Sequence, residues 1–117
     1  MATESPSIDW PGQSGKLYRY YFLADTSASA IKQEAGNYLF VRQTNREKNW
    51  WVPVYIGISD DLRARLSNHE VWEAAQRAGA TRIMGHTQAD RAARESEEQD
   101  LIARWQPPLN THHRKVG

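Results

Sequence analysis

Apolar and polar positions alternate in some segments of the chain and recur at helical spacing in others. Short runs rich in aromatic and β-branched residues, bounded by polar turn residues, predict strands over residues 16–23, 37–42, 50–57 and 81–86. Helical spacing and helix-boundary residues predict helices over residues 27–35, 59–69, 70–78 and 87–105. Ser59 is the predicted N-cap of the second helix, and Thr87 with Asp90 resembles a capping box opening the last one.

The two middle strands are predicted to pair as a hairpin across the polar turn between them. Because side chains alternate between the faces of a strand, the expected register gives one face to Leu39, Val41, Val52, Val54 and Ile56. The other face then carries Tyr38, Phe40, Trp51 and Tyr55. Pro53 has no backbone N–H, so we expect its strand to lie at a sheet edge or to be locally bulged.

The order of these elements predicts one α/β domain of the α+β kind. We expect a small, mainly antiparallel sheet of about three to four strands, sandwiched by helices. Residues 1–15 are polar and contain Pro and Gly, which predicts a flexible leader. The domain is expected over residues 16–110, as an N-terminal extension (16–35) and a core (36–110), followed by a polar tail (111–117).

Composition narrows the classes of function. Five Trp and five Tyr among 117 residues favour a folded domain with an aromatic core. The absence of cysteine excludes disulfide scaffolds, thiolate metal sites and cysteine nucleophiles. No apolar run is long enough to cross a bilayer and no signal peptide precedes the domain, so we expect a cytoplasmic protein without membrane association. The net charge of +1 gives no sign of a nucleic-acid partner.

Three sets of polar side chains could carry chemistry, and each has a structural alternative. Glu98 shares a helical stripe with Leu101, Ile102 and Trp105, which is compatible with a catalytic or metal-binding role or with a partly buried stripe in which Glu98 pairs with Arg94. Arg65 and His69 lie four residues apart on one helix face, and could equally be an exposed arginine and a helix-capping histidine. Tyr38 and Tyr55 share a hairpin face, where packing alone would also explain them.

The order of these residues along the chain is more specific than any one of them. The motifs in sequence are Gly36-Asn37-Tyr38, Tyr55-Ile56-Gly57, Arg65 with His69, Glu98 before Leu101-Ile102, and Asn110 after Pro107-Pro108. In residue type and order these motifs resemble those of the GIY-YIG nuclease superfamily, over about residues 36–110. The resemblance favours the chemical roles over the structural alternatives.

The chain departs from the family pattern at three points. Asn37 stands where the first motif usually has Ile, and Ile58 stands where some members have a Lys that lowers the tyrosine pKa. The sixteen residues between Tyr38 and Tyr55 make a longer gap than is usual, so we expect an enlarged hairpin loop.

The resemblance implies an endonuclease that hydrolyses DNA to 5′-phosphate and 3′-hydroxyl ends, with RNA as a further possible substrate and DNA repair or recombination as the setting. It implies a single Mg²⁺, for which Mn²⁺ can substitute, bound by Glu98, because Mg²⁺ needs few protein ligands. Arg65 would contact the phosphoryl oxygens and Tyr55 would deprotonate the attacking water, while Tyr38 positions water or phosphate. His69 would relay a proton or contact phosphate, and Asn110 would brace the site.

Two other interpretations stay open at this point. The chain could be a non-cleaving nucleic-acid-binding or protein-interaction module on the same scaffold, or an unrelated α/β domain with chance motif matches. Substrate specificity could come from a homodimer, from a partner protein or from basic segments. The candidate nucleic-acid-binding residues are Arg42, Arg46, Lys48 and Trp50 in the hairpin, with Arg114 and Lys115 in the tail.

Overall fold

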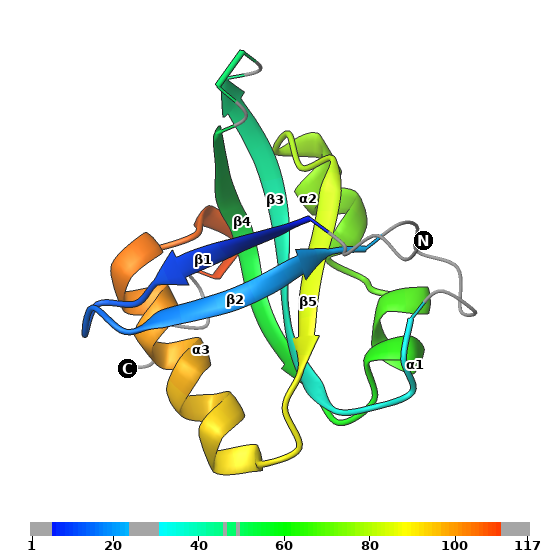
Figure 1. The fold of residues 1–117 in the computed structure, drawn as a ribbon. Helices are drawn as coiled ribbons and strands as arrows, with labels where there is room; N and C mark the ends of the chain where they lie inside the picture. Colours follow the sequence, from blue (N-terminus) through cyan, green and yellow to red (C-terminus); the bar gives the residue numbers. More distant parts are fainter. Residues whose placement is uncertain (1–5, 24–30, 46, 49, 111–117) are drawn as a thin grey trace, which may run out of the picture.

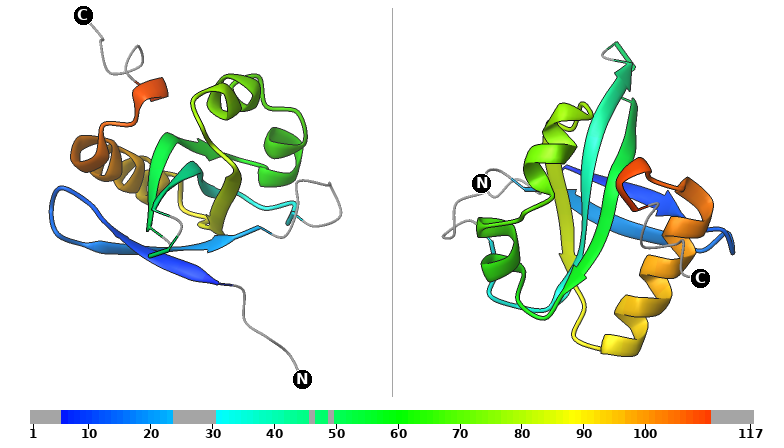
Figure 2. Two further views of the ribbon diagram at one scale, coloured as in Figure 1. Left: turned by 90° about the horizontal axis from the view of Figure 1, so that it is seen from above. Right: turned by 180° about the vertical axis from the view of Figure 1, so that it is seen from behind.

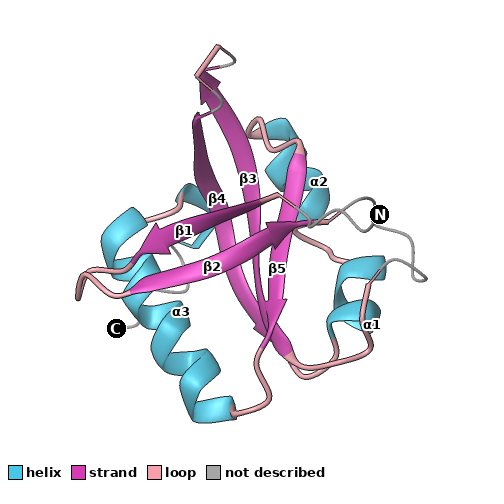
Figure 3. Cartoon of the chain, in the orientation of Figure 1, coloured by secondary structure: helices cyan, strands magenta, loops and turns pink. Residues whose placement is uncertain are grey.

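Five antiparallel strands form one sheet in the computed structural model, which describes residues 6–23, 31–45, 47, 48 and 50–110. The spatial order β1-β2-β5-β3-β4 places β3 between β5 and β4, with β4 at an edge (Figure 1, Figure 3). The strands are β1 (Ser7–Pro11), β2 (Leu17–Phe22), β3 (Gly36–Asn45), β4 (Trp50–Ser59) and β5 (Arg82–Thr87). The helices are α1 (Leu62–Ser67), α2 (Trp72–Arg77), α3 (Arg91–Trp105) and the short 3₁₀ turn η2 (Pro108–Asn110).

The expected α+β class is confirmed, although the described sheet has five strands instead of three or four. The sheet bears a hydrophobic cluster on each face. One cluster joins the Tyr38 and Phe40 side of β3 to α1 and α2, and the other joins the Leu39 and Val41 side to β1, β2 and α3. Figure 2 shows α1 and α2 on one side of β3 and β4, and α3 with the β1–β2 ribbon on the other.

Residues 7–11 form β1, whereas the sequence pattern predicts a flexible leader over residues 1–15. β1 pairs with β2 along its whole length and buries Trp10 to 2% exposure. The turn that follows is held by Asp100 of α3, whose carboxylate accepts hydrogen bonds from the backbone N–H and hydroxyl of Ser14 at 2.9 and 2.6 Å. Ser14 and Asp100 are 86 positions apart in the sequence, so no local pattern predicts their contact. Residues 1–5 lie outside the described part.

The predicted β3–β4 hairpin forms, but the expected enlarged loop is wrong: the extra residues lengthen the strands to Gly36–Asn45 and Trp50–Ser59. The two faces also do not divide as expected. Phe40 pairs with Tyr55 while Val41 pairs with Pro53, so Val54 is an extra residue in β4. This bulge reverses the alternation of the residues before it. Val54 therefore joins the Tyr38 face, and Trp51 joins the Leu39 face. The expectation of an edge or bulged strand at Pro53 is confirmed on both counts.

Helix boundaries differ from the predicted ones by a few residues. Asp61 caps α1 through its carboxylate and the Ala64 N–H, while the Ser59 hydroxyl bonds to the Asp61 backbone instead. Asp90 caps α3 in the same manner, and Thr87 ends β5. Residues 31–35 are not helical, and residues 27–30 of that predicted helix lie outside the described part. The predicted tail, residues 111–117, also lies outside it.

Candidate functional site

A pocket of about 680 Å³ opens at the β4 edge of the sheet, between α1 and α3. Five of the six predicted catalytic residues line it, each from a different element: Tyr38 of β3, Tyr55 of β4, Arg65 of α1, Glu98 of α3 and Asn110 of η2. Only His69 of the predicted set is absent from this lining. The structure therefore brings together residues that are up to 72 positions apart in the chain.

Gly57 allows the Tyr38 phenol to lie against β4. Tyr38 and Gly57 are paired across the two strands, and a Cβ atom on Gly57 would lie 2.4 Å from the Tyr38 Oη. The two phenol rings lie side by side, with 6.2 Å between their centroids. The glycine of the second motif thus has a packing reason at this position, because any side chain would displace the Tyr38 hydroxyl.

His69 lies behind Tyr38, out of reach of a ligand in the pocket. Its side chain is 1% exposed, and its Nε2 is 2.6 Å from the Tyr38 Oη. Nδ1 accepts a hydrogen bond from the Val71 N–H at 3.0 Å, so in the neutral ring the proton is on Nε2 and is donated to Tyr38. Two roles were predicted for His69. The geometry is compatible with a proton relay through Tyr38 and does not support a direct contact with phosphate.

Burial, with the Arg65 cation as a second cause, lowers the pKa of His69 from 6.5 to about 4. The folded state therefore binds fewer protons than the unfolded chain between those pH values. The stability that His69 contributes is complete above pH 6.5 and is lost as the pH falls towards about 4. As the pH falls from 6.5 towards about 4, we expect the difference in unfolding free energy between the wild type and His69→Gln to shrink. Urea denaturation at a series of pH values measures it, and a constant difference would contradict the buried neutral histidine.

Both phenols are poor bases in the protein as it stands. Burial is the main cause that raises the pKa of Tyr38 and of Tyr55 above the usual value of 10.0. The Arg65 cation acts in the opposite direction on both, and the Glu98 carboxylate adds to the increase. Ile58 stands where some members of the resembled family have a cation that lowers the tyrosine pKa; Arg65 acts in that direction here, but burial outweighs it.

Arg65 is held by the Glu70 carboxylate, which no sequence pattern indicates. Its two Nη atoms contact the two Glu70 oxygens at 2.9 and 2.7 Å, in a bidentate ion pair. This pairing is the largest cause that raises the pKa of Arg65 and lowers that of Glu70. Glu70 lies beyond the end of α1, where helical periodicity gives no guide to its partner. Arg65 is thus partly exposed, with 34% of its side chain accessible, and is paired with Glu70.

Glu98 is half-buried and faces the pocket from α3. No hydrogen bond or ion pair joins its carboxylate to another residue in the described part of the chain. Burial, and secondarily the Glu95 charge, raise its pKa above 4.5. The alternative ion pair with Arg94 is wrong, because the Arg94 guanidinium points away to Asp60 at 2.7 Å and to the carbonyls of Gln88 and Ala89.

Two buried asparagines hold the walls of the pocket in place. The Asn110 carboxamide accepts from the Ile56 N–H at 2.8 Å and donates to the Ile56 carbonyl at 2.9 Å, as a neighbouring strand would. Asn110 thereby continues the sheet beyond β4 and ties η2 to it, which fits the bracing role expected of it. Asn37 donates to the Arg94 carbonyl at 3.1 Å and so joins β3 to α3.

Glu98 is the only carboxylate among the pocket-lining residues that the structure describes. Across the described ranges, no three His, Asp or Glu side chains gather as a metal-binding group. Glu98 is a hard oxygen donor without a protein partner, and Mg²⁺ commonly binds proteins through one or two carboxylates and keeps several waters. A metal ion in this pocket would therefore have Glu98 as its acidic ligand among the described residues.

The predicted nucleic-acid-binding residues of the hairpin are spread along it. Lys48 lies in the turn and Trp50 begins β4, with the Lys48 Nζ 5.4 Å from the centre of the Trp50 ring. Arg42 is exposed but lies against the end of α2, since a Cβ on Gly79 would come within 3.2 Å of its Cδ. Arg46, Arg114 and Lys115 lie outside the described residues.

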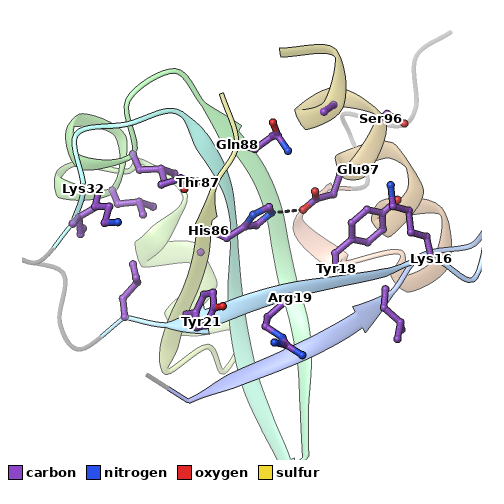
Figure 4. Close-up of a pocket in the computed structure, with 17 residues that line it drawn as sticks. Lys16, Tyr18, Arg19, Tyr21, Lys32, His86, Thr87, Gln88, Ser96 and Glu97 are labelled. Atoms are coloured by element: carbon purple, nitrogen blue, oxygen red, sulfur yellow. Dashed lines mark hydrogen bonds and ion pairs between the residues drawn. The ribbon is translucent and has the colours of Figure 1, made fainter. Parts of the chain in front are cut away.

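A second cavity, of about 690 Å³, lies between β2, β5, α1 and the first half of α3 (Figure 4). His86 and Glu97 meet at its wall, with Nε2 and Oε2 2.6 Å apart, and the Tyr20 hydroxyl donates to the same Oε2 at 2.5 Å. Glu97 is buried to 6% exposure and lies one residue from Glu98. The predicted stripe through Glu98 therefore missed the more deeply buried glutamate, which shares its helix face with Arg94 and Leu101.

No protein-family model, curated protein or solved structure matches this chain. None of the helices in the described ranges combines the length and apolar character that a membrane crossing requires.

Proposed function

We propose that this chain is a Mg²⁺-dependent endonuclease of the GIY-YIG type that hydrolyses DNA phosphodiester bonds. The observation that carries the proposal is the convergence of Tyr38, Tyr55, Arg65 and Glu98 on one pocket. Two phenols, a guanidinium and a carboxylate without a protein partner are the groups that phosphodiester hydrolysis needs: a base, positive charge and a metal ligand.

Each residue has a role that follows from its position. Glu98 would hold the metal ion, which when bound supplies positive charge to the phosphoryl group and the leaving oxygen. Arg65 would exchange Glu70 for the non-bridging phosphate oxygens, since both partners match its planar fork. Tyr55 would take a proton from the attacking water, and Tyr38, fixed by His69, would orient that water by hydrogen bonding.

The raised pKa of Tyr55 leads to a pH-dependent rate. If Tyr55 must ionise, we expect the logarithm of the cleavage rate to rise with pH across the neutral and mildly alkaline range, because the pKa lies above 10.0 in the free protein. Tyr55→Phe should lower the rate and flatten this profile. Tyr38→Phe should lower the rate while keeping the slope. The opposite pattern would assign the base to Tyr38.

A non-cleaving nucleic-acid-binding module is the second candidate, and the burial that raises the pKa of both phenols favours it. One assay separates the two functions. Labelled single-stranded, duplex, flap and branched DNA are incubated with the protein in Mg²⁺, in Mn²⁺ and in chelator. Cleavage that requires the metal supports the endonuclease. DNA binding without cleavage supports the module. The absence of both cleavage and DNA binding would refute both functions.

A further inference from the structure

Four of the five tryptophans gather at one place outside the candidate active site. A groove of about 320 Å³, here called the tryptophan groove, is lined by Ile8, Asp9, Trp10, Pro11, Trp50, Trp51 and Trp105. It lies where β1, the start of β4 and the end of α3 come together. The fifth tryptophan, Trp72, packs against Phe40 on the other face of the sheet.

The floor of the groove is rigid and one wall is exposed. The Trp105 indole donates to the Pro11 carbonyl at 2.9 Å and meets Trp10 edge to face, with 5.2 Å between ring centroids. Trp51 is fixed in the same manner against Phe22 at 5.1 Å. Trp50, by contrast, is 58% exposed at the base of the hairpin tip. The indole of Trp50 is thus presented to solvent beside the packed indoles of Trp10, Trp51 and Trp105.

Two cations lie over the rings of tryptophans that line the groove. Arg104 lies over Trp105 at 4.7 Å and Lys48 lies over Trp50 at 5.4 Å. Neither cation is paired with a carboxylate anywhere in the described part of the chain. Asp9, the acidic residue of the lining, is engaged by Arg19 at 2.8 and 3.2 Å. The surface around the aromatic faces therefore complements an anionic ligand that has flat rings.

We propose that the tryptophan groove binds an unpaired nucleobase of a DNA strand, with the phosphates on either side of that base near Lys48 and Arg104. A base inside a duplex is already stacked and hydrogen-bonded, so its faces are not available to Trp50. A single-stranded or splayed nucleotide presents a free face. The ligand class is therefore single-stranded DNA, or DNA with an unpaired segment.

The helix α3 connects this groove to the candidate active site. Trp105 is the last residue of α3, and its neighbour Gln106 lines the active-site pocket. Glu98 precedes Trp105 by seven residues, which is about 10 Å along the helix axis. A strand held in the groove could therefore continue into the pocket. This step rests on the proposed function, and it makes the preferred substrate one that is cleaved close to an unpaired segment.

Binding is tested without cleavage, in chelator, with a fluorescently labelled oligothymidine as the probe. We expect oligothymidine to bind, to quench tryptophan fluorescence, and to bind more tightly than a blunt duplex of equal length. Trp50→Ala should weaken binding about 5- to 100-fold. Tyr21→Ala is the matched control, because Tyr21 is an exposed aromatic residue (40%) outside the groove, and it should change little. Lys48→Ala and Arg104→Ala should each reduce the salt dependence, by about 0.7 in the logarithmic slope.

The outcomes separate this inference from the proposed function. Oligothymidine affinity that survives Trp50→Ala and both cation variants would overturn it, as would equal competition by polyglutamate, which offers charge without bases. If DNA is cleaved but Trp50→Ala leaves oligothymidine binding unchanged, the groove is wrong and the endonuclease stands. If no DNA is cleaved but Trp50→Ala weakens oligothymidine binding, the groove stands and the endonuclease is wrong.

Discussion

Glu98→Ala is expected to lower metal-dependent DNA cleavage to background, by more than about 10³-fold, while the fold is retained. The pocket offers no second carboxylate among its described lining residues to take over as metal ligand. Since the Glu98 carboxylate has no hydrogen-bond or ion-pair partner in the described chain, its removal leaves no protein group unsatisfied. Cleavage rates in Mg²⁺, with circular dichroism of the same preparation, measure both effects.

Glu95→Ala is the matched control for this experiment. Glu95 lies one turn earlier on α3 and forms an ion pair with Arg91 at 3.1 Å, outside the pocket. It should retain activity close to that of the wild type. Normal cleavage by Glu98→Ala would refute the proposed metal site, and equal loss in both variants would trace the effect to the helix.

Glu98 also makes the stability of the folded protein depend on pH. Burial raises the pKa of Glu98 in the folded state above 4.5, so the folded protein holds its proton more tightly than the unfolded chain. The stability this provides is complete below pH 4.5 and is lost as the pH rises through the raised pKa. At neutral pH the ionised carboxylate is therefore a cost, and Glu98→Gln should be no less stable than the wild type there.

Arg65→Ala is expected to reduce the cleavage rate by about 10²–10³-fold, the loss typical of one transition-state donor. Arg65→Lys should recover only part of this, because an ammonium group cannot make the bidentate contact. Single-turnover cleavage rates measure the effect on the chemical step. Wild-type rates in Arg65→Ala would remove this residue from the site.

Two further variants separate the role of Arg65 from its ion pair. Arg77→Ala breaks the Arg77–Glu73 ion pair, whose atoms are 2.9 Å apart on the surface of α2, and should leave cleavage unchanged. Glu70→Gln frees Arg65 from its competing carboxylate, so DNA binding should become tighter. A loss of cleavage in Glu70→Gln as large as in Arg65→Ala would show that the ion pair itself is required.

The local pattern predicted the β3–β4 hairpin and its irregular second strand. Which side chains of β4 lie on which face of the sheet could be learned only from the structure. The bulge at Val54 adds one residue to β4, and a shift of one residue moves every side chain before it to the opposite face. Pro53 signalled an irregularity without showing where the extra residue would lie. Trp51 therefore belongs to the tryptophan groove, which no spacing along the chain could reveal.

Local patterns in the sequence were enough to predict the α+β class, most of the strands and helices, and five residues that line one pocket. Periodicity, capping and turn residues act over a few positions, so a sequence carries that information directly. The partners of the polar side chains followed from packing. His69 contacts Tyr38 across 31 positions, and Glu97 contacts Tyr20 and His86 across 77 and 11 positions. Glu70 pairs with Arg65 just beyond the end of α1. Such contacts depend on how sheet and helices pack, and that packing also turned an expected leader into the edge strand that completes the tryptophan groove.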